Sequence, residues 1–314
     1  MLSVIVPIYN SASTLEKCIR SLTDQTYTDL QIILIDDGSN DGSAEICDTL
    51  ASRDHRITVL HKENEGASIA RNRGMKIATG EWLTFLDSDD TVEKDMYEYM
   101  LSSAAIDADI IQCAVNIVDG ESKTVLCSPK RDKLYSSSSL GKEFFKHLGG
   151  GVWNKIYKRS LIDGLEFDSQ YPIGEDMKFN IEAISRAKNV LLLKKAKYNY
   201  VQNPNGLCRT ITEASLLSYR KMLSELLSSR ALPRAKGLLT ALYLENNADM
   251  MSKLLTRSID EPAGLICTLR KEVRNGAAKY LFSPYISIKM KLKLTLIGFS
   301  FGLYKRILLK KKRA

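Results

Sequence analysis

Three carboxylates stand directly after a short apolar run, at a spacing that suits metal chemistry. The run 82–86 is followed by Asp87, Ser88, Asp89 and Asp90. A buried strand that stops in acids places charge at the carboxyl edge of a sheet, where open α/β sheets bind ligands. The D-x-D spacing lets two carboxylates face one hard divalent cation, Mg²⁺ or Mn²⁺. A solvated acidic turn that caps the next helix is the alternative, and the motif alone does not decide between them.

Acids also follow a second apolar run and open one later helix. The run 30–35 is followed by Asp36 and Asp37, and Glu175 and Asp176 open a predicted helix. The two strand ends are expected to meet at one edge of the sheet. Unpaired like charges cost stability, so a cation or an arginine is expected beside them. For Glu175 and Asp176, the helix dipole alone offers a structural explanation.

The elements around these acids alternate between strands and helices. Strands are predicted at 4–8, 30–35, 57–60 and 82–86, and helices at 13–22, 44–52 and 67–78. This alternation predicts parallel βαβ units and a doubly wound α/β sheet. No G-x-G-x-x-G follows the first strand and no G-x-x-x-x-G-K-S/T occurs, so the usual dinucleotide site and the P-loop are excluded.

Composition indicates a soluble globular protein with a charged end. Of the 314 residues, 44% are apolar and 26% are charged. The six cysteines are scattered without a C-x-x-C pair, which favours free thiols in a reducing compartment. The chain enters an apolar strand at once, so no signal peptide is expected. Residues 273–314 hold eleven Lys/Arg and no Asp/Glu, within a net charge of +8 for the whole chain.

The chain changes character after about residue 206. We predict an α/β domain at 1–208, a helical region at 209–284 and a basic amphipathic tail at 285–314. The tail alternates Lys with apolar residues, which favours a strand, although its long side chains also permit an interfacial helix. Its uncharged run 294–304 is too short to span a bilayer. A core element, a membrane-surface anchor and a nucleic-acid patch compete, and we favour the anchor.

Several segments, taken in their order, resemble family 2 of the nucleotide-sugar glycosyltransferases. They are VIVPIYN, IDDGSNDGS, NEGASIARNRG, FLDSDD and VWNKIYKRSLI, followed by the Glu175-Asp176 pair. The resemblance covers about residues 3–205 and implies a Rossmann-like GT-A catalytic domain. It implies an inverting, metal-dependent transfer of a hexose or N-acetylhexosamine from a UDP-sugar. The implied acceptor is a glycan or a polyprenyl-diphosphate-linked chain in the synthesis of bacterial capsule, exopolysaccharide or teichoic acid.

The resemblance also assigns donor-site residues. The implied donor-binding residues are Pro7, Tyr9, Asn10, Asp36, Asp37, Asn64, Arg71, Asp87 and Ser88. Asp37, with or without Asp36, would accept a hydrogen bond from the uracil imide N–H, although both acids also suit a simple turn. Asp87 would hold the ribose or the donor sugar, and Asp89 would bind Mn²⁺ or Mg²⁺ on the diphosphate. Arg71 is either a donor contact or the partner of the acidic edges.

Asp176 is the implied catalytic base, and Glu175 would orient the acceptor or tune its neighbour. Inversion needs a carboxylate that takes the acceptor proton during attack. The helix start is expected to lower the pKa of Asp176 and keep it ionised. Trp153 would stack on a sugar if it is exposed, and is otherwise a core residue. Gly149–Gly151 predicts a flexible or close-packed backbone near the site.

Two other functions stay open on this sequence. A non-catalytic nucleotide-sugar or nucleic-acid binding module would use the same edge and the basic tail. A nucleotidyltransferase would use similar acids, but no glycine-rich basic triphosphate loop follows the first strand. We therefore expect a cytoplasmic enzyme that is peripheral on the inner face of the cell membrane, with an anionic membrane surface and no nucleic acid as partner. The sequence does not fix the donor sugar, the linkage or the oligomeric state.

Overall fold

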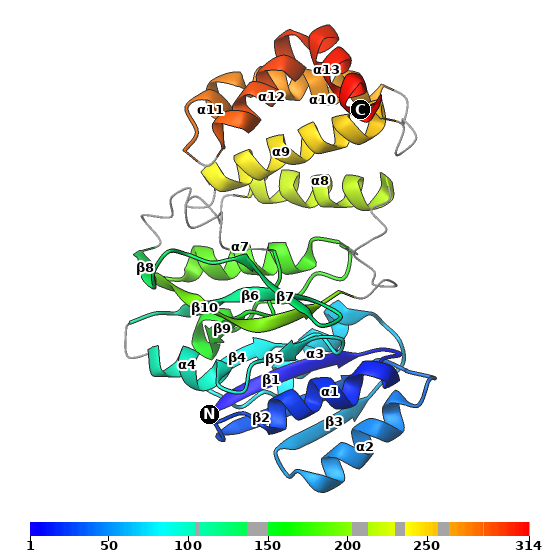
Figure 1. Ribbon diagram of the computed structural model, residues 1–314, viewed down its shortest axis with the longest axis vertical. Helices are drawn as coiled ribbons and strands as arrows, with labels where there is room; N and C mark the ends of the chain where they lie inside the picture. Colours follow the sequence, from blue (N-terminus) through cyan, green and yellow to red (C-terminus); the bar gives the residue numbers. More distant parts are fainter. Residues whose placement is uncertain are drawn as a thin grey trace. The chain divides into compact units, whose positions relative to one another are not determined.

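The computed structural model describes residues 1–103, 107–136, 150–171, 173–202, 213–229, 236–256, 264–284 and 286–313. These residues form two compact units (Figure 1). The first contains nearly all described residues up to 202. The second contains Tyr171, residues 173–174 and the described residues from 213 onward.

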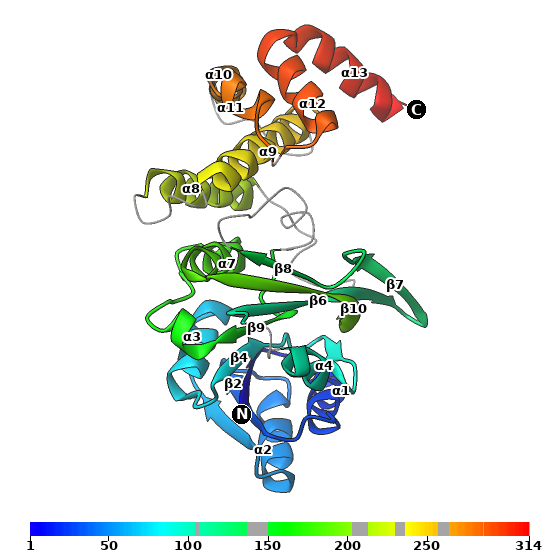
Figure 2. The same ribbon diagram turned by 90° about the vertical axis from the view of Figure 1, so that its left-hand side faces the viewer.

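The described part of the first unit is built on a ten-stranded mixed sheet. Its strands are β1 (Leu2–Ile8), β2 (Leu30–Asp36), β3 (Ile57–His61), β4 (Trp82–Phe85), β5 (Thr91–Val92), β6 (Ile110–Asp119), β7 (Ser122–Cys127), β8 (Lys133–Ser136), β9 (Lys155–Lys158) and β10 (Asn189–Val201). The order is β3-β2-β1-β4-β9-β6-β10-β5, with β7 on β6 and β8 on β10. Figure 2 shows β7 folding back along β6 as a hairpin.

The first four strands are parallel, which confirms the predicted α/β class. β1 pairs in parallel with β2 and β4, and β2 pairs in parallel with β3. Because these strands run the same way, their carboxyl ends lie at one edge of the sheet, so the acids that follow β2 and β4 share that edge, with β1 between them. β9 then enters antiparallel between β4 and β6, so the sheet is mixed beyond β4.

Helices cover both faces of this sheet. They are α1 (Ala12–Thr23), α2 (Ser43–Arg53), α3 (Ala67–Ile77), α4 (Met96–Ser102), α6 (Arg159–Ile162) and α7 (Glu175–Arg186). On β1, Val4 and Val6 pack into the core shared with α1, whereas Ile5 faces α3. Gly74 permits this close approach, since a Cβ there would lie 2.4 Å from Cγ2 of Ile5. The backbone of α3 is therefore held tightly against the sheet.

The second unit is helical in its described residues. Its helices are α8 (Glu213–Ser228), α9 (Lys236–Leu255), α10 (Leu265–Asn275), α11 (Ala277–Leu281), α12 (Ile288–Phe299) and α13 (Phe301–Arg313). The tail is thus two helices and not a strand. Ser287 caps α12 by accepting a hydrogen bond from the Met290 N–H at 3.1 Å, and Leu294 and Ile297 enter the core. In the part of the chain described, every helix is too short or too polar to cross a bilayer.

Candidate active site

One buried arginine joins the acids after β4 to the acids that open α7. Arg71 lies in α3 and is 5% exposed. Its Nη2 donates to Oδ1 of Asp87 at 2.9 Å. Its Nη1 lies 3.1 Å from Oδ1 of Asp176 and 3.4 Å from Oε1 of Glu175. The D-x-D segment and the Glu-Asp pair therefore share one charged centre, and Arg71 supplies the positive charge that the clustered acids need.

An aromatic cluster fixes the elements that carry these charges. Phe167 lies 5.3 Å from the Arg71 guanidinium carbon, and its ring centroid is 5.0 Å from Phe85 and 4.2 Å from Phe179. Asn72 holds the Phe167 backbone at both its N–H and its C=O, at 2.8 Å each. Phe85 ends β4 and Phe179 belongs to α7, so the cluster sets their separation. Our sequence reasoning missed Asn72 and Phe167, because nothing in a single sequence pairs residues so far apart.

Burial dominates the electrostatics of the Glu-Asp pair. Burial raises the pKa of Asp176, although Arg71, the Val152 backbone N–H and the Lys155 ammonium oppose this rise. Burial and the neighbouring Asp176 also raise the pKa of Glu175, to about 7. The prediction that the helix start lowers the pKa of Asp176 was wrong, because desolvation outweighs the dipole. The higher pKa makes Asp176 a stronger base than an ordinary aspartate.

Asp37 holds the turn that leads into α3. Its Oδ1 accepts the Glu65 N–H at 2.9 Å, its Oδ2 accepts the Gly66 N–H at 2.8 Å, and the Lys62 ammonium pairs with Oδ1. Gly66 has a φ of 92°, which an L side chain adopts only with strain. Asp37 is thereby fixed beside the N-terminus of the helix that carries Arg71.

Asp36 is engaged mainly in structural contacts. Its Oδ1 accepts the Ser39 N–H at 3.1 Å, and its Oδ2 lies 2.9 Å from Nδ1 of His61. The other ring nitrogen of His61 lies 3.1 Å from Asp48, and these two hydrogen bonds raise the pKa of His61. These contacts favour the structural alternative for Asp36, in which its carboxylate stabilises the turn after β2.

The end of β1 lies at the same edge of the sheet. Pro7 is within β1, Tyr9 follows it with half of its side chain exposed, and Asn64 is also exposed. Asn10 adopts a left-handed φ of 50°, and its Oδ1 accepts the Asn40 N–H at 3.0 Å. Tyr9 and Asn64 are therefore open to a ligand, whereas Asn10 also organises the loop after β2.

Asp89 is the least engaged acid of the D-x-D segment. Ser88 is tied to α1, because its Oγ is 2.7 Å from Oγ of Ser11 and its C=O accepts from Thr14 Oγ1 at 2.9 Å. Among the described residues, the Asp89 carboxylate pairs with no cation, and its own backbone N–H lowers its pKa only in part. Burial and the charge of Asp87 raise its pKa. Asp87 has Arg71 as its counter-charge, whereas no described cation pairs with Asp89.

Asp90 anchors the D-x-D segment to β10. Its Oδ2 accepts the Tyr198 hydroxyl at 2.5 Å, and its Oδ1 accepts the Val201 N–H at 2.7 Å. Burial raises the pKa of Asp90 to about 8. Trp153 is half-buried and stacks on Tyr198 with ring centroids 4.4 Å apart, so one side of its ring packs against the core. The anchoring role of Asp90 was not visible in the sequence.

A match to a known protein family covers this part of the chain. Residues 3–165 match the model described as Glycosyl transferase family 2, which is just over half of the chain. The chain belongs to glycosyltransferase family 2. The match includes Asp37, Arg71 and the D-x-D segment, whereas the Glu-Asp pair on α7 lies beyond it.

This family 2 chain is similar to several bacterial proteins. The glycosyltransferase EpsJ of Bacillus subtilis is 35% identical over 215 residues, 66% of this chain and 62% of EpsJ. The minor teichoic acid biosynthesis protein GgaB of the same species is 32% identical over 211 residues, 65% of this chain and 23% of GgaB. The chain thus spans less than two thirds of the length of either. Two crystal structures of S. aureus TarS 1-349, one with UDP and one with UDP-GlcNAc, are similar to this chain, each with a TM-score of 0.72. Their sequence identities are 20% and 19%, and each match covers 99% of this chain and 91% of the TarS chain. They show the GT-A fold.

The D-x-D segment of this family 2 domain suits the binding of one divalent cation. The protein would supply only some of the oxygen ligands of that cation. Among the described residues, no group of three or more His, Cys, Asp or Glu is arranged to hold a metal. Asp89 offers hard oxygens and, within the described ranges, has no cationic partner, which fits a metal cation. Mg²⁺ is commonly held by one or two carboxylates together with substrate phosphates and water. The residues therefore fit a metal that is bound jointly with a diphosphate.

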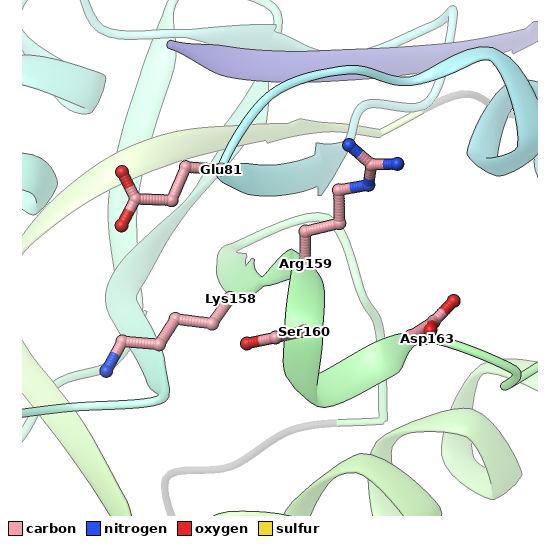
Figure 3. A pocket seen from close by; sticks show the side chains of 5 residues that line it. All are labelled: Glu81, Lys158, Arg159, Ser160 and Asp163. Carbon is pink, nitrogen blue, oxygen red and sulfur yellow. The ribbon is translucent and has the colours of Figure 1, made fainter.

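Two hollows in the first unit lie away from these acids. One of about 400 Å³ is lined by Glu81, Lys158, Arg159, Ser160 and Asp163 (Figure 3). Glu81 precedes β4, whereas Asp87 follows it, so this hollow lies at the opposite end of the strand. A second hollow, of about 870 Å³, includes Met1 and Thr28, which precede β1 and β2. Neither hollow contains any of the acids described above.

Proposed function

We propose that this chain transfers a hexose or N-acetylhexosamine from a UDP-sugar to a glycan acceptor, with inversion at the anomeric carbon. The observation that carries the proposal is the bridge made by Arg71. It holds Asp87 of the D-x-D segment and Asp176 of the Glu-Asp pair within one charged centre. A donor diphosphate and a general base would then act within one site, which such a transfer needs.

The donor would lie along the carboxyl edge of β1, β2 and β4. Asp37 would accept the uracil imide N–H at Oδ2, which keeps a lone pair beside the Gly66 N–H, whereas Oδ1 already has the Glu65 N–H and the Lys62 ammonium. The exposed Tyr9 and Asn64 would contact the nucleoside. Asp87 would accept hydrogen bonds from ribose or sugar hydroxyls, while Arg71 holds its carboxylate in place. A Mn²⁺ or Mg²⁺ ion held by Asp89 would act as a Lewis acid on the diphosphate.

Asp176 would be the general base. Its carboxylate would take the proton of the acceptor hydroxyl as that oxygen attacks the anomeric carbon. The bond from this carbon to UDP breaks on the opposite face, and UDP leaves with the electron pair. Arg71 keeps Asp176 ionised against burial, and the raised pKa strengthens it as a base. Glu175 would orient the acceptor or tune its neighbour.

A cell-surface glycan is the acceptor that we infer. GgaB carries a teichoic acid biosynthesis name, and one TarS structure contains UDP-GlcNAc. These similarities support a UDP-N-acetylhexosamine or UDP-hexose donor. They also support an acceptor among the polymers that bacteria build at their surface, on a polyprenyl diphosphate or as teichoic acid.

A donor screen tests the proposed activity. UDP-glucose, UDP-galactose, UDP-GlcNAc and UDP-GalNAc are offered with Mn²⁺, Mg²⁺ or chelator, and GDP-mannose serves as control. We expect UDP release from at least one UDP-sugar, lost with chelator, and none from GDP-mannose. Asp89→Asn should raise the metal concentration needed by about tenfold or more. UDP binding without any sugar transfer would favour a binding module, and nucleotidyl transfer would favour a nucleotidyltransferase.

We also propose that the second unit binds an anionic membrane surface. On α12, Ile288, Leu292 and Phe299 are 75%, 63% and 52% exposed. These positions are spaced at i, i+4 and i+11, so they form one stripe on the helix. Lys289 and Lys291 flank the stripe. A line of exposed apolar side chains between cations fits the interface of an anionic bilayer better than water.

Helix α13 continues the same pattern. Leu303 and Ile307 are 51% and 40% exposed at i and i+4, with Arg306 and Lys310 beside them. No Asp or Glu occurs from residue 273 onward, so no acidic side chain of this segment opposes anionic lipid. The apolar side chains would enter the interface while the cations contact lipid phosphates.

Vesicle sedimentation of the full chain tests this surface. We expect binding to vesicles that contain phosphatidylglycerol, weaker binding at high salt, and little binding to phosphatidylcholine alone. Ile288→Asp with Leu292→Asp should weaken binding by about tenfold or more, since each buried aliphatic side chain contributes about 1.5–3 kcal/mol. Val125→Asp with Leu126→Asp on β7, where both residues are 58% exposed, is the matched control. Equal binding by both double variants would refute the assignment to α12.

A further inference from the structure

Lys155 is a buried lysine that the proposed chemistry leaves unused. It begins β9, its side chain has no exposed surface, and burial lowers its pKa to about 7. Its Nζ donates to the Gly151 carbonyl at 2.6 Å and to Oδ1 of Asn154 at 2.9 Å. Removing an ammonium from water is costly, so a buried one is expected to hold specific partners. Here the main partner is the backbone of a glycine segment.

A second buried side chain holds the same backbone from α7. Asn180 is fully buried, and its Nδ2 donates to the Gly150 carbonyl at 2.7 Å and to the Gly151 carbonyl at 3.2 Å. The Tyr157 hydroxyl donates to Oδ1 of Asn180 at 2.7 Å, which fixes the orientation of the amide. The Gly151 carbonyl thus receives donors from both Lys155 and Asn180.

This glycine segment is close-packed. A Cβ on Gly151 would lie 2.2 Å from Nε1 of Trp153, and a Cβ on Gly150 would lie 3.3 Å from Cε of Met177. Of the two alternatives that the sequence offered, close packing therefore holds for these two glycines. Gly149 lies outside the described residues.

The clamped backbone faces the proposed base. The next residue is Val152, whose N–H interacts with the Asp176 carboxylate and lowers its pKa. The positive charge of Lys155 acts on Asp176 in the same direction. Asn180 lies four residues after Asp176 on α7, one helical turn away. Through Asn180, the helix that carries the base is joined to the Gly150–Gly151 backbone.

Several charges surround Asp176. Arg71 and Lys155 favour its ionised form, whereas the charges of Asp87 and the adjacent Glu175 oppose it. The buried Tyr157 hydroxyl also interacts electrostatically with Asp176. Replacing Lys155 with Met removes one of the two described cations that lower the pKa of Asp176. Removing Asn180 leaves all these charges in place.

We propose that Lys155 and Asn180 are positioning residues for the catalytic base, because they join the Gly150–Gly151 backbone to α7, the helix that carries Asp176, and so fix where the Asp176 carboxylate lies. This inference rests on the proposed function, in which Asp176 takes the acceptor proton. Lys155 acts through both position and charge, and Asn180 acts through position alone. The two residues therefore predict different kinetic signatures.

The test compares Lys155→Met and Asn180→Ala in the full chain. Each should lower kcat by about tenfold or more, with the KM for the UDP-sugar unchanged, because a misplaced catalytic group slows the step that follows binding. Lys155→Met should also move the acid limb of the pH profile of kcat to higher pH, since loss of a cation raises the pKa of Asp176. Asn180→Ala should not move it in that direction.

Lys158→Met is the matched control, since it removes a lysine of the same strand whose ammonium pairs with Asp109. It should leave kcat and the acid limb unchanged. Thermal unfolding checks that the variants fold, and Tyr157→Phe is the milder variant should the others fail to fold. Removing its hydroxyl frees the Asn180 amide and should lower kcat about two- to fivefold, since one neutral hydrogen bond contributes about 0.5–1.5 kcal/mol.

If the variants that fold have the kcat of the wild type, the inference is wrong. If kcat falls for Lys155→Met but the acid limb of its pH profile does not shift, Lys155 has only a packing role. The proposed function fails separately. It falls if the wild-type chain transfers no sugar, or if Asp176→Asn retains transfer. If Asp176→Asn is inactive while Lys155→Met and Asn180→Ala behave like the wild type, only the positioning inference falls.

Discussion

Replacing Asp176 with Asn is expected to lower kcat for sugar transfer by about 10²–10⁴-fold, the range that a general base supplies. The amide keeps the shape of the carboxylate but cannot take the acceptor proton. Arg71 would still pair with Asp87 and Glu175, so the fold and the UDP affinity should be nearly unchanged. Initial rates at saturating donor, together with calorimetric titration of UDP, measure both quantities.

The pH dependence of kcat provides a second test of Asp176 as the base. Because burial raises the pKa of Asp176, the acid limb of kcat should lie above the pKa of an ordinary aspartate, which is about 4. As the pH falls below the pKa of Asp176, the base becomes protonated and kcat decreases. As the pH rises above this pKa, kcat reaches a plateau. Asp176→Asn should abolish the limb. Glu182→Gln, further along α7, is the control that should keep it.

Two results would remove Asp176 from the mechanism. One is transfer by Asp176→Asn at a rate close to that of the wild type. The other is a wild-type kcat that stays flat through the carboxylate range. Either result would leave the bridge by Arg71 as a structural feature and would place the base elsewhere.

Replacing Arg71 with Met should reduce both stability and activity. Asp87, Glu175 and Asp176 would then lose their shared counter-charge in a largely buried site. Breaking a buried pair from one side costs about 3–5 kcal/mol, so the free energy of unfolding should fall by about that amount. Transfer should fall by about 100-fold or more, because neither carboxylate would keep its position. Denaturant unfolding and initial rates measure the two effects.

A double variant makes the prediction for Arg71 specific. Arg71→Met with Asp176→Asn removes one of the uncompensated charges, so it should regain part of the stability lost in Arg71→Met alone. Arg73→Met, which removes an exposed arginine of the same helix, should change stability by less than about 0.5 kcal/mol. If Arg71→Met is as stable as Arg73→Met, the charged centre contributes nothing to stability and Arg71 does not hold the site together.

Features that depend on local pattern were predicted best from the sequence. Apolar runs that end in acids placed Asp37 and Asp87 at strand ends, because a parallel sheet brings its carboxyl ends to one edge. The helix predicted at 13–22 is present as α1, and Leu15 and Ile19 are buried on one face of it. These results depend on residues close together in the chain, where periodicity and the polarity of each position are sufficient.

Features that depend on distant partners could not be predicted in this way. The helix dipole is a local signal, but the burial that raises the pKa of Asp176 comes from the three-dimensional packing of α7. The sequence did not distinguish Asp90 from its neighbouring acids, because its partner, the Tyr198 hydroxyl, lies on the distant strand β10. In the tail, lysines and apolar residues alternate at period two, which favours a strand. This segment nevertheless forms the helix α12, because Leu294 and Ile297 pack into the core of the second unit from one side of the helix. No local pattern contains these contacts.

A crystal structure of the full chain with UDP and Mn²⁺, with the anomalous signal of manganese, tests the central claim most directly. We predict one manganese peak that touches both a carboxylate oxygen of Asp89 and the diphosphate. We also predict the uracil beside Asp37 and the Asp176 carboxylate facing the position of the donor sugar. Nucleotide density in another part of the molecule, or manganese bound without Asp89, would contradict the claim.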